Sequence, residues 1–235
     1  FHILDNLSYV LILGITSITL FNSIVYYSLQ FTQVISGVLM ISTIPVMIIF
    51  FSSLLKIEKT NFYQIMGVVF SMLGVIVIVT QLNEEKIKTL SFNKGDLSII
   101  IAMLSWALYS ALLKKKKLEL SQLSLLQVII SSGLIFLLPI YIIEMKQGQI
   151  VTLELPFVLT LIYVVLFPGL ASFICWIKGI GLIGTNRSGI FLHLIPIFST
   201  MMAILIFNEK FMFFHLVGVI LIISGIVLSS KGRHA

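Results

Sequence analysis

The most informative polar side chain in this sequence is a histidine embedded in an apolar run. His193 lies about one third of the way along the apolar span at 186–207, which contains the segment GIFLHLIPIFSTMMAILIF at 189–207. An ionisable group at that depth in hydrocarbon is expensive, so its presence indicates a role such as facing a polar path or relaying protons. A neutral imidazole bonded to a backbone carbonyl or a serine is the structural alternative.

Two further pairs of side chains have the spacing of neighbours on one helix face. Asn22 and Tyr26 are four residues apart, and Trp106 and Tyr109 are three apart. Neutral polar and aromatic pairs of this kind suit a cavity for small polar organic molecules, although hydrogen bonds between helices use the same residue types. Together with His193, these four residues are the predicted lining of a substrate pathway.

The sequence lacks the groups on which most catalytic and metal sites depend. No Asp or Glu lies well inside an apolar run, and neither HExxH nor GxSxG occurs. The single cysteine, Cys175, excludes an internal disulfide and a cysteine cluster for a metal. An intramembrane enzyme is therefore the weaker hypothesis, and we expect no catalysis, no metal and no cofactor.

The elements that carry these residues are predicted to be membrane helices. Hydrophobic residues make up 59% of the 235 residues and charged residues 10%, against roughly 45–50% and 25% in soluble domains. Apolar runs of about 18 or more residues recur, and each is long enough to cross the hydrocarbon core as a helix. The sequence thus predicts an all-α polytopic membrane protein with eight spans, at 8–29, 34–55, 62–81, 96–113, 122–143, 156–177, 186–207 and 211–230.

The basic residues lie mainly in the joints between these spans. The formal charge of +6 therefore indicates contact with lipid headgroups and not a nucleic-acid site. With Phe1 on the cytoplasmic side, ten Lys and Arg residues fall on that side and five on the other, which favours a cytoplasmic C-terminus. We expect a multi-pass protein of the cell inner (cytoplasmic) membrane. The sequence does not indicate an oligomeric state.

Residues 34–74 and 185–225 are two copies of one pattern. At a single offset of 151 residues, five punctuating residues match without a gap: Pro45 with Pro196, Glu58 with Glu209, Lys59 with Lys210, Gly67 with Gly218, and Gly74 with Gly225. The offset moves a span five places along the chain, and because five is odd, the matched helices cross the membrane in opposite directions. Such inverted repeats are typical of secondary transporters.

The matched residues also have predicted roles. Pro45 and Pro196 fall near the bilayer midplane, where a proline leaves the carbonyl four residues earlier, such as that of Leu192, without its usual donor. We expect the prolines to act as hinges, with a packing kink as the alternative. The four matched glycines are expected to allow close helix packing. Glu58 and Glu209 are expected to mark membrane boundaries, with gate salt bridges as the alternative.

The doubled pattern of a proline, a glutamate thirteen residues later and two glycines seven apart resembles the EamA-type families of the drug/metabolite transporter superfamily. The stretches GDLSIIIAMLSWALYSALLKKK at 95–116 and GTNRSGIFLHLIPIFS at 184–199 resemble its sixth and ninth helices. The resemblance implies ten helices in two inverted five-helix repeats, of which eight are present. Residues 1–82 then correspond to helices 3–5, 83–95 to a linker and 96–235 to helices 6–10, with two helices expected before Phe1.

The function implied by the repeat and the resemblance is secondary transport of small metabolites, such as amino acids, by alternating access, with export as the expected direction. The expected partners are a small-molecule substrate and membrane lipid. Coupling to protons, for which His193 is the candidate, stays open beside facilitated diffusion. A non-transporting membrane scaffold is the alternative from another class.

Overall fold

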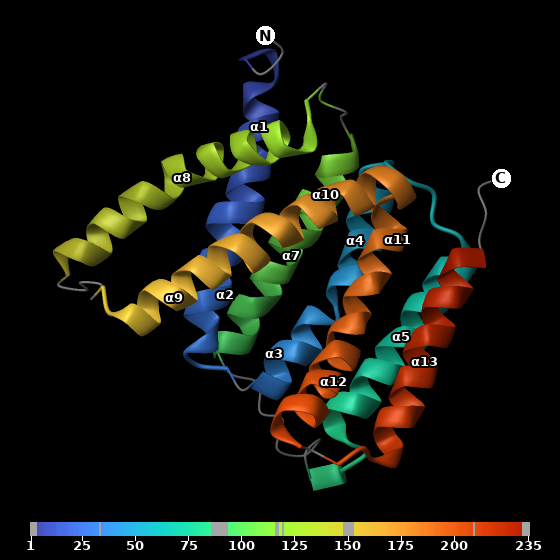
Figure 1. Ribbon diagram of the computed structural model, residues 1–235. Helices are drawn as coiled ribbons and strands as arrows, with labels where there is room; N and C mark the ends of the chain where they lie inside the picture. The colour runs from blue at the N-terminus through green and yellow to red at the C-terminus, as the bar shows by residue number, and fades with distance from the viewer. Residues whose placement is uncertain are drawn as a thin grey trace.

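The computed structural model describes residues 4–32, 34–85, 94–115, 118, 120–147, 153–208 and 210–231 (Figure 1). Within these ranges the regular secondary structure is helical, and eight helices are long and apolar enough to cross a membrane. They are Leu7–Leu29, Ser36–Leu54, Phe62–Thr80, Lys94–Lys115, Gln122–Lys146, Leu155–Ile183, Thr185–Phe207 and Phe213–Lys231. The predicted all-α polytopic membrane fold is confirmed.

The predicted span boundaries agree with the structure to within about three residues, except at the end of the sixth span. We predicted an end at residue 177, one residue before Lys178, but the helix continues to Ile183. A lysine near a helix end extends its charged tip toward water while its stem stays apolar, so it does not end the helix. Gly184 ends the helix, because its φ of 87° lies outside the helical range.

Several spans are built from more than one helical segment. The first span comprises α1 (Leu7–Gly14), the π-helical turn η2 (Ile15–Leu20) and α2 (Phe21–Leu29), after the short turn η1 (Leu4–Asn6). The second comprises α3 (Val34–Ile41) and α4 (Ile44–Leu54), and the sixth α9 (Leu155–Val164), the π-helical turn η3 (Val165–Ala171) and α10 (Ser172–Ile183). The seventh comprises α11 (Thr185–Ile190), the 3-10 turn η4 (Phe191–Leu194) and α12 (Ile195–Phe207). The remaining spans are single helices: α5 (Phe62–Thr80), α7 (Lys94–Lys115), α8 (Gln122–Lys146) and α13 (Phe213–Lys231).

The offset of 151 residues found in the sequence recurs in the helix boundaries. The helices α4 and α12 begin at Ile44 and Ile195, and α5 and α13 begin at Phe62 and Phe213. The same offset relates the first residues of α2 and α10, Phe21 and Ser172, and the last residues of the two π-helical turns, Leu20 and Ala171. The shared offset thus extends to the starts of helices in the first and sixth spans, which lie outside the segments matched in the sequence.

The helices α5 and α13 pack along most of their length, side by side at one edge of the bundle (Figure 1). A Cβ on Gly67 would lie 2.5 Å from the Gly225 carbonyl oxygen, and one on Gly74 would lie 2.6 Å from that of Gly218. Residue numbers rise along one helix as they fall along the other, so the pair is antiparallel. Applying the offset to either contact yields the other, which is the arrangement of an inverted repeat. The four glycines lie where the two helices approach each other most closely in these contacts.

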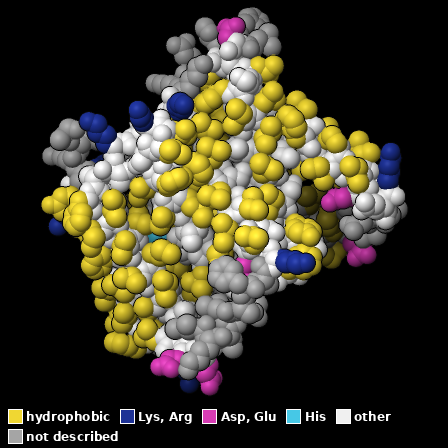
Figure 2. Space-filling model, turned by 180° about the vertical axis from the view of Figure 1, so that it is seen from behind, with side chains coloured by type: hydrophobic (Ala, Val, Ile, Leu, Met, Phe, Trp, Pro, Cys, Tyr) yellow, Lys and Arg dark blue, Asp and Glu magenta, His cyan; other side chains and the backbone are white. Residues whose placement is uncertain are grey.

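The central helix α7 organises the main apolar core. This core also contains buried side chains of α1, α4, α8 and α10, with side chains of α2 packed against it, whereas a smaller cluster of Val75, Ile78 and Ile222 lies between α5 and α13. Many large apolar side chains of α8, α9 and α12 are exposed. Figure 2 shows hydrophobic side chains across the middle of one face and charged side chains mostly toward its edges, as expected of a surface in contact with lipid.

Candidate functional site

The two spans that carry the matched prolines are both interrupted just before the proline. The second span is broken between Ile41 and Ile44, and the seventh passes through the 3-10 turn η4. Each proline then lies in the first turn of the next helix, where its missing N–H leaves no hydrogen bond unmade. The expectation of an unpartnered Leu192 carbonyl is wrong. That carbonyl accepts a bond from the Ile195 N–H, because a 3-10 turn pairs residues three apart.

His193 lies in η4, is fully buried and joins the two broken spans. Its Nε2 is 2.9 Å from the carbonyl oxygen of Ser42, the residue at the equivalent position 151 residues earlier. Its Nδ1 is 2.5 Å from the Ser71 hydroxyl on α5. A carbonyl only accepts hydrogen bonds, so Nε2 carries a hydrogen and donates it. In the neutral ring, Nδ1 therefore accepts from Ser71.

A cluster of aromatic side chains surrounds Trp106 on α7. The Trp106 ring centroid lies 4.6 Å from that of Phe21, 5.3 Å from those of Tyr109 and Phe173, and 5.8 Å from that of Trp176. These rings come from α2, α7 and α10. Trp106 is about twelve residues into α7, which corresponds to a depth of about 18 Å along the helix and hence to the middle of a bilayer.

Polar groups within this aromatic cluster differ in how well they are satisfied. The Trp176 indole N–H donates to the Ser110 hydroxyl at 3.1 Å, and Ser110 donates to the Trp106 carbonyl at 2.8 Å. The Tyr109 side chain is fully buried, and its hydroxyl has no hydrogen-bond partner among the described residues. A buried hydroxyl without a partner carries a free-energy penalty of about 1–3 kcal/mol, so its position requires an explanation.

The other predicted pathway residues lie in separate places. Asn22 is partly buried, and its amide donates to the carbonyls of Ser17 and Ile18 at 3.0 and 3.1 Å, in the π-helical turn η2. Tyr26 is 58% exposed and lines a groove of about 480 Å³ between α2 and α8. The structure thus brings Trp106 and Tyr109 together, while Tyr26 and His193 lie outside the aromatic cluster.

Sequence reasoning missed three members of the cluster, Phe21, Phe173 and Trp176. A signal for two of them was available, because Phe173 and Trp176 are three residues apart in the sixth span. That is the same helical spacing as in the pair Trp106 and Tyr109. Phe21 carries no such signal, since one phenylalanine among 18 is not distinctive.

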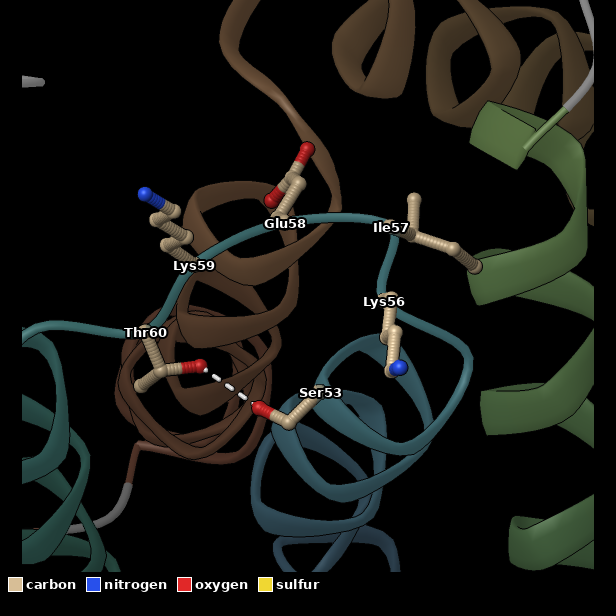
Figure 3. Close-up of a pocket in the computed structure, with 6 residues that line it drawn as sticks. All are labelled: Ser53, Lys56, Ile57, Glu58, Lys59 and Thr60. Atoms are coloured by element: carbon tan, nitrogen blue, oxygen red, sulfur yellow. Dashed lines mark hydrogen bonds between the residues drawn. The ribbon is translucent and has the colours of Figure 1, made fainter.

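Glu58 lies in the loop between α4 and α5, beside an open hollow of about 700 Å³ lined by Ser53, Lys56, Ile57, Glu58, Lys59 and Thr60 (Figure 3). Its carboxylate accepts hydrogen bonds from the backbone N–H groups of Thr185 and Asn186 at 2.9 and 3.1 Å. The contact joins the loop to the first turn of α11. Its sequence counterpart Glu209 lies outside the described residues.

The part of the chain that the structure describes holds no group of three or more His, Cys, Asp or Glu side chains arranged to bind a metal ion. The aromatic cluster offers rings and hydroxyls, and the His193 imidazole lies apart from it at the break in the seventh span. Such groups bind and orient small organic molecules through stacking and hydrogen bonds.

The chain matches the sequence model of the EamA-like transporter family over residues 2–80 and 93–231. It is 25% identical over 220 residues to uncharacterized transporter YyaM of Bacillus subtilis, a match that covers 94% of this chain and 72% of the relative. It is 26% identical over 222 residues to uncharacterized transporter YetK of the same organism, a match that covers 93% of this chain and 66% of the relative. It is 25% identical over 223 residues to an uncharacterized transporter of Archaeoglobus fulgidus, a match that covers 95% of this chain and 76% of the relative. A solved structure described as "Crystal structure of protein" has a TM-score of 0.75 at 15% identity, over 94% of this chain and 75% of that chain, so the fold is shared.

Proposed function

Because the chain belongs to the EamA-like transporter family, we propose that it is a secondary transporter that moves a small metabolite by alternating access. In this proposal residues 1–82 are the last three helices of the first repeat, residues 96–235 are the second, inverted repeat, and residues 83–95 link them. The carrying observation is that the second and seventh spans are broken at equivalent positions and meet there through His193 and Ser42. In alternating access the two repeats exchange conformations, and Pro45 and Pro196 follow the breaks at which the backbone changes direction.

The substrate that best suits the aromatic cluster is an amino acid or a related small metabolite with both an apolar and a polar part. Rings from α2, α7 and α10 supply apolar surface, and the Tyr109 hydroxyl is a hydrogen-bond donor without a protein partner among the described residues. The cluster is closed in this conformation, since Trp106 is only 8% exposed. The proposed direction is outward across the cytoplasmic membrane.

Flux in reconstituted vesicles tests this function. Liposomes that contain the purified protein are loaded with unlabelled amino acids or nucleosides, and entry of the labelled compound is followed. Counterflow that exceeds that of empty liposomes and saturates with substrate is the expected result for a carrier. Lack of counterflow for every compound, from protein shown to be folded, would favour a non-transporting scaffold.

A Tyr109→Phe substitution separates a substrate contact from a structural one. Removing a buried, unpartnered hydroxyl should stabilise the substrate-free protein by about 1 kcal/mol. If the hydroxyl binds substrate, the concentration that gives half-maximal counterflow should rise about tenfold, the equivalent of roughly 1.4 kcal/mol. Thermal unfolding and counterflow measure the two effects, and Tyr163→Phe is the control because Tyr163 is 58% exposed on α9. Higher stability with unchanged half-saturation would exclude the hydroxyl as a substrate contact.

The proposed topology is tested by labelling single cysteines in a Cys175→Ser background. Cysteines in place of Ser121, just before α8, and Leu153, just before α9, should react with a membrane-impermeant reagent from opposite sides. Ser121→Cys should react from the cytoplasm, because ten of the fifteen basic residues fall on that side. Reaction of both cysteines from the same side would contradict the inverted arrangement.

A further inference from the structure

The contact between Glu58 and the start of α11 joins the two halves of the chain. Glu58 and Thr185 are 127 residues apart in the sequence. Glu58 Oε1 accepts from Thr185 N–H, and Oε2 accepts from Asn186 N–H. Each carboxylate oxygen therefore has its own backbone donor. Hydrogen bonds to an ionised acceptor are roughly twice as strong as neutral ones, so the carboxylate is suited to hold these two elements together.

The turn before α11 is shaped to admit this carboxylate. Gly184 has a φ of 87°, a conformation that residues with a Cβ adopt only with strain. A Cβ at Gly184 would also lie 2.5 Å from Glu58 Oε1 and 3.2 Å from Oε2. Both the backbone conformation and the space in front of the N–H groups therefore depend on glycine at this position.

Neighbouring polar contacts orient the loop that carries Glu58. The Asn186 amide donates to the Thr60 hydroxyl at 3.3 Å, and the hydroxyls of Thr60 and Ser53 are 2.9 Å apart. In Figure 3 the Lys56 and Lys59 side chains point away from the Glu58 carboxylate, which extends toward the chain of the second half. The carboxylate thus serves the contact between the halves.

Both sides of this contact can be satisfied when it is broken. The first N–H groups of a helix have no partner within the helix, so water can replace the carboxylate there. Glu58 lies in a loop and is partly exposed, so its carboxylate can also return to water. A contact that exchanges for water on both sides suits a joint that opens and closes repeatedly.

We propose that Glu58 is a latch that closes the cytoplasmic end of the protein between its two repeats. The contact with Thr185 and Asn186 forms when this end is closed and breaks when the pathway opens to the cytoplasm. The assignment rests on the proposed alternating access, and the cytoplasmic location of the loop rests on the distribution of basic residues. Gly184 acts with Glu58 by leaving room for its carboxylate.

The test measures access to a position directly beneath the latch. Ser188 lies one turn into α11, is 3% exposed, and is replaced by cysteine in a Cys175→Ser background. In the parent, N-ethylmaleimide should label this cysteine slowly. Glu58→Gln retains an acceptor oxygen but loses the charge, and it should raise the labelling rate at least about tenfold, because the charge-assisted bonds are the stronger ones. Gly184→Ala should do the same by expelling the carboxylate.

Two controls separate opening from unfolding. Glu154→Gln changes a carboxylate that precedes α9 without making a side-chain cap bond, and it should leave the labelling of Ser188→Cys unchanged. Val75→Cys reports on the buried core between α5 and α13 and should stay protected in every variant. Faster labelling at both reporters would show that Glu58 supports the fold, and unchanged labelling at Ser188→Cys would show that it closes nothing. Either outcome overturns the latch.

The labelling is carried out without any substrate, so it stands apart from the flux measurement. A protein whose Ser188→Cys reporter responds to Glu58→Gln but which shows no counterflow would retain the latch and lose the proposed transport. Counterflow in a protein whose Ser188→Cys reporter does not respond to Glu58→Gln would support the proposed transport and overturn the latch.

Discussion

Replacing Gly67 by alanine is expected to destabilise the protein strongly. The added Cβ would lie 2.5 Å from the Gly225 carbonyl oxygen, 2.7 Å from Ser229 Cβ and 2.8 Å from Ser229 N. Two of these atoms are backbone and the third is attached directly to it, so no side-chain rotation relieves the clash. The helices α5 and α13 would have to separate, and we expect a loss of about 3 kcal/mol, at the upper end of the usual cost of overpacking.

Thermal unfolding in detergent and the yield of monodisperse protein measure this loss. The matched control is Gly181→Ala on α10, where a Cβ would meet nothing within 4 Å. That change should be neutral or stabilise the protein by up to about 1 kcal/mol, because alanine favours the helix over glycine. Equal stability of Gly67→Ala and Gly181→Ala would mean that α5 and α13 do not cross at their glycines.

Replacing His193 by glutamine is expected to abolish the dependence of transport on a pH gradient while leaving counterflow intact. The protonated ring has donors at both nitrogens, so it can keep the bond to the Ser42 carbonyl and donate to Ser71. The Ser71 hydroxyl is then free to donate to the Val68 carbonyl, which is 3.1 Å away. The site thus offers hydrogen bonds to both protonation states, whereas glutamine cannot take up a proton in this range.

Few other titratable groups are available in the elements packed around His193. Along their described lengths, α3, α4 and α12 contain no titratable side chain. The titratable side chains of α5, α11 and α13 lie in terminal turns or beside the helix ends, and they are Tyr63, Arg187, His215 and Lys231. A pH response that originates in this part of the bundle is therefore expected to come from His193.

Two substitutions serve as controls for His193→Gln. Ser71→Ala removes a hydrogen-bond partner but keeps the imidazole, and His215→Gln removes a histidine whose Nδ1 accepts from the Met212 N–H at 3.0 Å. Both should retain uptake driven by a pH gradient. The measurement compares that uptake with counterflow in the same proteoliposomes. Unchanged gradient-driven uptake in His193→Gln would remove this residue from the coupling mechanism.

The membrane fold was largely predictable, because a chain in lipid must satisfy its own backbone hydrogen bonds within helices. The membrane helices therefore begin and end close to the residues predicted from the apolar runs. The predicted end of the sixth span was wrong because a lysine is tolerated at the membrane edge. The backbone conformation of Gly184 ends this helix. The prolines and glycines identified the repeat, since few other residues break a helix or permit close packing.

The family resemblance implied that the first and sixth spans correspond, but no matched residues in the sequence showed it. The first residues of α2 and α10 obey the same offset as the matched segments, as do the last residues of the two π-helical turns. Apolar side chains replace one another freely on helices that face lipid, so these spans retain a common shape without matching residues. Helix boundaries preserve the relation where residue identities do not.

The sequence by itself determined which residues share a helix face and which stand at the depth of the helix breaks. It paired Trp106 with Tyr109, and it marked His193 and the two prolines. Only the tertiary structure decided that Phe21 and Trp176 meet Trp106, that His193 bonds Ser42 and Ser71, and that Glu58 meets Thr185 at a separation of 127 residues. These partners depend on the rotation and tilt of one helix against another. Spacing within a span is set by helical geometry alone, whereas that rotation is set by contacts between spans, such as the crossings at Gly67 and Gly74.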